Sequence, residues 1–306
     1  MLGNSRHLFR MLPLLVTLGL LVTTACDVVE PPYRQNSGGG GNNSITDSLV
    51  QDYNFDTLPD TRRVLLEEFT GIKCGFCPPA GKEALRLRAQ YEDQVVFLQY
   101  HATGLAEPDD DGLYTADYTT QWGDELVTDF DLPGTPIGLI NRMGLDVNGR
   151  LDSTLGYTFW DFLLQDQVLA LPNEAKLGVS AQMTEDTRTL TVDVFFEALT
   201  DLPPDQFLVV VITEDSLVSP QKWYNNDPED LENYVHRFVV RRNLTGNYGV
   251  PLSDGPIPEG TRLGQRLSTT IPQEWNADHL YVAAFISDNP SKDIRQAAET
   301  PVQRVN

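Results

Sequence analysis

The hydrophobic pattern of residues 63–100 predicts two buried strands separated by a helix. Residues 63–69 (Arg-Val-Leu-Leu-Glu-Glu-Phe) and residues 94–100 are mostly apolar runs of strand length. Between them, residues 78–91 start with two prolines, which the first turn of a helix tolerates, and then continue with helix-forming residues. This order and spacing are typical of a β-α-β unit.

The second half of the chain has a different period. Apolar and polar residues alternate along residues 190–196, and similar strand-like runs follow at 207–213, 234–242, 266–271 and 280–286. Several short strands separated by Pro, Asp and Gly are typical of a β-sandwich. We therefore expect an α/β domain followed by an all-β sandwich (Ig-like) domain.

Two further helices are expected in the first half, over residues 114–130 and 159–168. The second of them would close the α/β domain. The predicted boundaries are residues 61–172 for that domain and 173–306 for the sandwich, because the period of the pattern changes between them.

Charge excludes some partners. The 306 residues include 44 acidic and 22 basic ones, a formal net charge of -22. The electric field of such a negative protein repels phosphate backbones and anionic lipid. We therefore expect no nucleic-acid partner and no electrostatic binding to membranes.

The N-terminus has the pattern of a secretory signal. Arg6 and Arg10 precede an apolar run, residues 11–22, which is too short to span a bilayer. The run ends in Thr-Thr-Ala before Cys26, which resembles the lipobox of bacterial lipoproteins. That resemblance implies that residues 1–25 are removed and that Cys26 carries the lipid anchor; an ordinary signal with an incidental cysteine is the alternative. The Gly-rich residues 26–60 are predicted to be a flexible tether.

Cys74 and Cys77 are the candidate reactive groups. Such a close pair is a weak structural staple, worth roughly 2 kcal/mol, and no second cysteine pair completes a zinc site. The spacing suits a reversible disulfide, and the following helix and Lys73 favour a thiolate. We expect Cys74 to be the more exposed sulfur and Cys77 to be shielded one turn into the helix.

Residues 68–77, with Glu68 six positions before the first cysteine, resemble the first signature of the thioredoxin superfamily. Residues 132–141 resemble its second signature, a cis-proline loop that runs into a strand. The resemblance implies a thioredoxin-like fold over residues 61–172. It also implies a cis bond between Thr135 and Pro136 that faces the dithiol.

More narrowly, the chain resembles the 28-kDa outer-membrane lipoprotein family. The resemblance is carried by the lipobox, by residues 67–71 before the dithiol, by residues 134–142 and by the β-rich C-terminal region. It implies a lipid-anchored protein of the cell envelope, in the outer membrane.

The expected function is thiol–disulfide exchange with envelope proteins that carry thiols or disulfides. Cys74 would attack, Cys77 would resolve the mixed disulfide and Glu68 would relay a proton. Thr135 and Pro136 would hold the backbone of the partner, and neither a cofactor nor a metal is expected. The alternative is a binding or structural lipoprotein that uses its sandwich and in which the dithiol is vestigial.

Other polar residues have plainer interpretations. His101 ends the second predicted strand, where packing or solvation is the expected role. His236 is predicted to be a hydrogen-bonded core residue. Residues 107–112 lack the ligand pattern of an EF-hand, so we expect a solvated loop.

Overall fold

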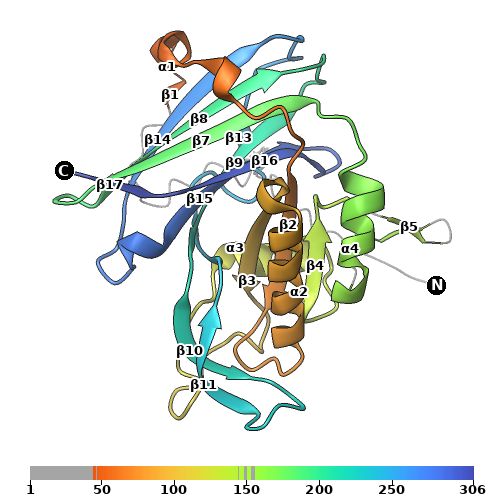
Figure 1. Cartoon of the computed structure of the whole chain (residues 1–306), viewed down its shortest axis with the longest axis vertical. Helices are drawn as coiled ribbons and strands as arrows, with labels where there is room; N and C mark the ends of the chain where they lie inside the picture. The colour runs from red at the N-terminus through yellow and green to blue at the C-terminus, as the bar shows by residue number, and fades with distance from the viewer. Residues whose placement is uncertain (1–43, 46, 144, 148–149, 153–155) are drawn as a thin grey trace, which may run out of the picture. The chain divides into compact units, whose positions relative to one another are not determined.

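The computed structural model describes residues 44–306 apart from residues 46, 144, 148–149 and 153–155 (Figure 1). The predicted signal peptide, Cys26 and the first part of the predicted tether lie outside the described residues. In the described part, strands predominate and helices are few. The fold is therefore a β-rich one with mixed sheets.

The largest sheet contains strands from both halves of the sequence. Its order is β16-β15-β9-β12-β3-β2-β4, and β13 pairs with β9. β12 lies parallel to β3, with Val239 opposite Gln99, so one sheet runs across the predicted boundary between residues 172 and 173. The strands are β2 (Val64–Thr70), β3 (Val95–His101), β4 (Ile137–Ile140), β9 (Gln206–Glu214), β12 (Val239–Asn243), β13 (Val250–Pro251), β15 (Leu280–Asp288) and β16 (Ile294–Pro301).

A second sheet of five strands packs against part of the first. It has the order β1-β14-β8-β7-β17. Alternate residues of β9 explain the contact: Val210 and Ile212 enter the core shared with this sheet, whereas Val209 and Val211 face the core on the other side. The five strands are β1 (Ser44–Ile45), β7 (Ala175–Thr184), β8 (Thr189–Ala198), β14 (Arg262–Thr270) and β17 (Gln303–Val305).

Helices cover both faces of the β2–β3 part of the large sheet. α2 (Cys77–Gln90) packs its small residues on one face, together with Trp160 of α4 (Trp160–Phe162). Leu126 of α3 (Gln121–Asp129) packs on the other face. α4 continues as a π-helical segment, Leu163–Val168. The remaining helical elements are short: α1 (Asp47–Asp52) and 3-10 turns at Phe55–Thr57, Glu92–Gln94, Tyr157–Phe159 and Ala277–His279.

The last described part of the predicted tether is packed rather than free. Tyr53 stacks on Phe195 with ring centroids 3.5 Å apart, and Phe55 and Leu58 are buried beside it. Burial of these apolar side chains stabilises an ordered segment. The prediction of a flexible tether over residues 26–60 is therefore wrong for residues 53–58.

Two predicted elements are shorter than the sequence pattern suggested. The helix expected over residues 114–130 is confined to α3, which begins after Thr120 caps the amide of Gly123. The strand expected over 234–242 is broken, because Asp215 binds both Arg237 and the amide of Phe238 at a sharp bend. Its two parts are β11 (Asp230–His236) and β12.

Candidate functional site

The two cysteines lie at the junction between β2 and α2. They form a disulfide with a Cα–Cα distance of 5.4 Å, and Cys77 is the first residue of α2. The turn closes through the amide of Cys77, which donates to the carbonyl of Cys74. Gly71 is required just before this turn, because a Cβ there would lie 2.5 Å from the Leu105 carbonyl oxygen.

Glu68 lies behind the disulfide, under α2. Its Oε2 accepts a hydrogen bond of 3.0 Å from Gln99, and its Oε1 has no hydrogen-bond partner. The same Oε2 lies 3.6 Å from the position that a Cβ would take at Gly81, one turn after Cys77. Burial raises the pKa of Glu68 to about 8, although the bond from Gln99 opposes this rise. The carboxyl is therefore a proton donor at neutral pH.

Glu67 points to the opposite face of the same strand. Both of its carboxylate oxygens bind the guanidinium of Arg142 at 2.7 Å, and both side chains are fully buried. Arg142 also donates to the carbonyl of Asn247. Because side chains alternate along β2, the two adjacent acids have different environments. Glu67 belongs to a buried ion pair, whereas the buried carboxyl of Glu68 is bonded to the neutral side chain of Gln99.

The Thr135–Pro136 peptide bond is cis, as is Asp227–Pro228. β4 runs antiparallel to β2 with Ile137 opposite Phe69. Pro136 therefore lies next to the end of β2 at which the disulfide loop begins. The hydroxyl of Thr135 is buried and has no hydrogen-bond partner.

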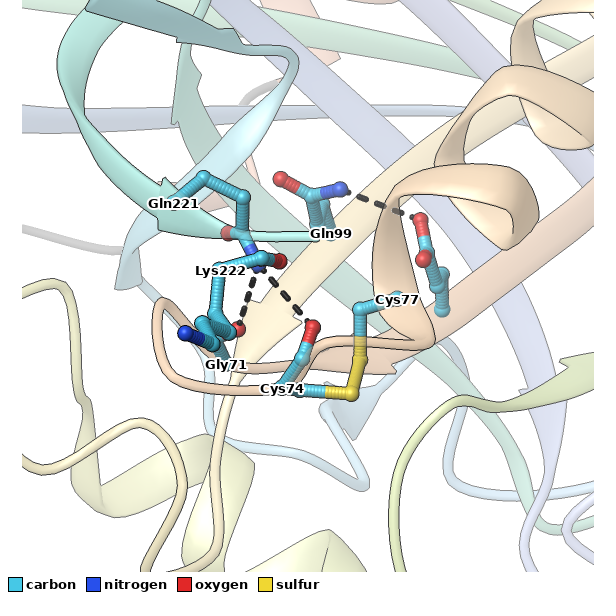
Figure 2. The surroundings of a disulfide bond; sticks show 7 residues. Gly71, Cys74, Cys77, Gln99, Gln221 and Lys222 are labelled. Atoms are coloured by element: carbon cyan, nitrogen blue, oxygen red, sulfur yellow. Dashed lines mark hydrogen bonds between the residues drawn. A yellow bond between two sulfur atoms is a disulfide. The ribbon is translucent and has the colours of Figure 1, made fainter. Parts of the chain in front are cut away.

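A hairpin from the second half of the chain covers the disulfide loop. It consists of β10 (Leu217–Lys222) and β11 and forms a two-stranded sheet of its own (Figure 1). Figure 2 shows the side-chain amide of Gln221 donating to the carbonyls of Gly71 and Cys74, at 3.2 and 3.1 Å. We refer to residues 217–236 as the hairpin below.

This cover corrects the expected exposure of the cysteines. Cys74 and Cys77 are each only 2% exposed, so Cys74 is not the more accessible sulfur. The hairpin contacts the loop backbone around Cys74, and local sequence could not reveal this contact. Lys73, which we expected to favour a Cys74 thiolate, instead forms an ion pair of 2.8 Å with Asp109.

A buried polar cluster between the hairpin and the end of β3 was not expected from the sequence. The ring of His101 lies 5.1 Å from that of His236, and neither ring nitrogen of His101 has a hydrogen-bond partner. His236 does have a hydrogen-bond partner, because its Nε2 lies 2.9 Å from the Ser219 hydroxyl. This agrees with the prediction that His236 is a hydrogen-bonded core residue. Burial lowers the pKa of both histidines, that of His236 to about 4, so both are neutral at pH 7.

Within the described residues, no group of three or more His, Cys, Asp or Glu side chains is arranged to hold a metal ion. No helix in the same part of the chain is long and apolar enough to cross a membrane. The described site offers the chemistry of the disulfide and of the buried carboxyl beside it.

Comparison with protein-family models finds a match over residues 123–305 to the family described as outer membrane protein Omp28. The chain belongs to this family. The matched residues include Pro136 and the hairpin but neither cysteine nor Glu68. A search of curated protein sequences finds no match.

Comparison with solved structures also finds matches. HBP35 of Porphyromonas gingivalis has a TM-score of 0.56 at 17% identity, over 80% of this chain and 77% of that one. A protein from Agrobacterium tumefaciens has a TM-score of 0.45 at 18% identity, over 79% of this chain and 95% of that one. A domain of the outer membrane lipoprotein Omp28 from Porphyromonas gingivalis has a TM-score of 0.29 at 14% identity, over 44% of this chain and 91% of that one.

Proposed function

We propose that the chain is a binding or structural lipoprotein of the outer membrane that works through its β-rich C-terminal region. The observation that carries this proposal is the closure of the Cys74–Cys77 disulfide beneath the hairpin. A disulfide that partners cannot reach in the resting protein is poorly suited to exchange, which needs access to sulfur. The family match, which leaves out both cysteines, supports the same conclusion.

The proposal includes an anchor and a domain organisation. Residues 1–25 would be a signal peptide, and Cys26 would hold the protein in the membrane through lipid. Residues 61–172 would be a thioredoxin-like domain, supported by parallel β2 and β3 joined through α2. Residues 173–306 would form an Ig-like sandwich, supported by the core between the two sheets.

Replacement of Cys26 by Ala should move the full-length protein from the membrane fraction to the soluble fraction. The physical reason is the loss of the acyl chains, each methylene of which contributes roughly 0.8 kcal/mol to membrane binding. Fractionation of cells and intact-mass measurement of the mature wild-type chain are the tests. A wild-type protein without lipid mass on its first residue would contradict the anchor.

Binding by the β-rich region should not depend on the dithiol. We expect the Cys74→Ser/Cys77→Ser double variant to be cross-linked in cells to the same envelope proteins as the wild type. The measurement uses a non-reducible cross-linker and mass spectrometry, at membrane levels matched by immunoblot. Partners that disappear in the double variant, or that a reducing agent releases from the wild type, would overturn the proposal.

Thiol–disulfide exchange is the second candidate, and Glu68 is the observation that favours it. A buried carboxyl beneath the first turns of α2, with a pKa of about 8 close to that of a free thiol, can exchange a proton with Cys77. Its protonated form gives the proton to a Cys77 thiolate, and its ionised form takes the proton back. Cys74 would attack the disulfide of an envelope protein, and Cys77 would displace the reduced partner. Thr135 and Pro136 would then lie against the partner backbone. Partners lost from the double variant would favour this candidate.

A further inference from the structure

The hairpin contacts the disulfide loop through main-chain hydrogen bonds. The amide of Lys222 donates to the carbonyl of Ile72, and the amide of Tyr224 donates to the carbonyl of Gly75, both at 2.8 Å. Amides two residues apart on the hairpin thus donate to carbonyls three residues apart in the turn of the loop, so the contact uses main-chain groups without forming a strand pair. The backbone of residues 71–75 thus presents a row of acceptors.

A side-chain amide completes this contact. Gln221 is buried, and its Nε2 lies within hydrogen-bond distance of three carbonyls, those of Gly71, Cys74 and Lys222. Together with the two backbone amides, it places donors next to four of the five carbonyls in residues 71–75. The surface therefore matches a segment that carries an amide side chain next to its first donating backbone amide.

An aromatic side chain fills the other end of the same surface. A Cβ at Gly75 would lie 2.5 Å from ring atoms of Tyr224, so only a glycine leaves room for that ring on the loop. Phe76 contacts the ring edge-on, with centroids 5.0 Å apart, and both rings remain substantially exposed. The preferred segment therefore has an aromatic residue three positions after its amide residue.

No third strand holds the hairpin in a sheet in the described structure. β10 and β11 form a strand ladder with each other alone, and a two-stranded hairpin without further packing is at best marginally stable in water. Its contacts with the rest of the chain are separate hydrogen bonds and side-chain contacts, such as that of Lys82 over the ring of Trp223. The exposed cross-strand pair Val218 and Val235 shows that its outer face packs against nothing in the described structure. At its base, Ser216 and Phe238 both have positive φ, so two bends mark where it joins the large sheet.

We propose that residues 71–75 are a binding surface for a polypeptide segment, and that residues 221–224 occupy it as an internal substitute. A partner segment with a side-chain amide and an aromatic residue three positions later displaces the hairpin and takes over its hydrogen bonds. This inference goes beyond the proposed function and needs no thiol chemistry.

The test uses Gln221→Glu in the full-length protein. The new side chain faces carbonyl oxygens with at most one proton to donate, and with none when it is ionised, so the hairpin should open more often. Asn233→Asp is the matched control, because it makes the same chemical change at an exposed position of the hairpin. We expect hydrogen exchange in residues 221–224 to be at least tenfold faster in Gln221→Glu and unchanged in Asn233→Asp.

Binding is measured with a fluorescent synthetic peptide that has the sequence of residues 219–226. It should bind Gln221→Glu at least tenfold more tightly than wild type, since the internal competitor is weakened. A peptide in which glutamine is replaced by glutamate should not bind. Gly75→Ala should also speed exchange in the hairpin but should bind the peptide poorly, because the methyl group blocks the aromatic ring. Fast exchange in Gln221→Glu without peptide binding would overturn the proposal, as would exchange unchanged from wild type.

Discussion

Replacement of Glu68 by Gln is expected to raise the free energy of unfolding by roughly 3–5 kcal/mol at pH 9. Burial raises the pKa of Glu68 from 4.5 to about 8 in the folded chain. As the pH rises from 4.5 to 8, the unfolded chain loses this proton while the folded chain keeps it. The wild type therefore loses stability across that interval, and glutamine, which does not ionise, removes the loss.

Urea unfolding followed by circular dichroism at pH 4, 6, 8 and 9 is the measurement. The two proteins should converge at pH 4, where the carboxyl is protonated in both states. Glu232→Gln, at an exposed site on the hairpin, is the control and should remain within about 0.5 kcal/mol of wild type. Parallel pH profiles of Glu68→Gln and wild type would show that the carboxyl is not held neutral by burial.

Loss of the Glu67–Arg142 pair should change stability by a similar amount in the opposite direction. Arg142→Met leaves the Glu67 carboxylate fully buried without a cation, and we expect a loss of about 3–5 kcal/mol at pH 7. The carbonyl of Asn247 also loses its donor. The double variant Glu67→Leu/Arg142→Met should recover most of this loss, because apolar residues of similar size often replace a buried pair at little cost.

Arg86→Met is the matched control for this experiment. Arg86 pairs with Glu83 and Asp161 at the surface, where an ion pair is worth about 0–1 kcal/mol. An effect of Arg142→Met as small as that of Arg86→Met in urea unfolding would contradict the structural role of the buried pair.

Local sequence was enough to locate the elements around the dithiol. β2, α2 and β3 lie within a residue or two of the predicted segments, because long apolar runs and helix-compatible prolines are strong local signals. Tyr53, Phe55 and Leu58 are large apolar side chains that could also have indicated burial. We assigned them to the tether because of the Gly-rich residues before them.

Contacts between distant residues could not be predicted. Gln221 lies 147 residues from Cys74 along the chain, and nothing in the sequence around it indicates that it binds this loop. The parallel pairing of β12 with β3 is similarly distant, so the large sheet that joins the two halves was missed. The break between β11 and β12 depends on Asp215, whose bonds to Arg237 and Phe238 local periodicity does not reveal.

The central claim is that the Cys74–Cys77 disulfide is closed beneath the hairpin in the resting protein. Its most direct test is the rate at which glutathione reduces this disulfide, measured by alkylation and intact mass. The account predicts reduction at least tenfold slower in the folded wild type than in protein unfolded by urea, with Gln221→Glu between the two. Equal rates in the folded and unfolded protein would contradict the account.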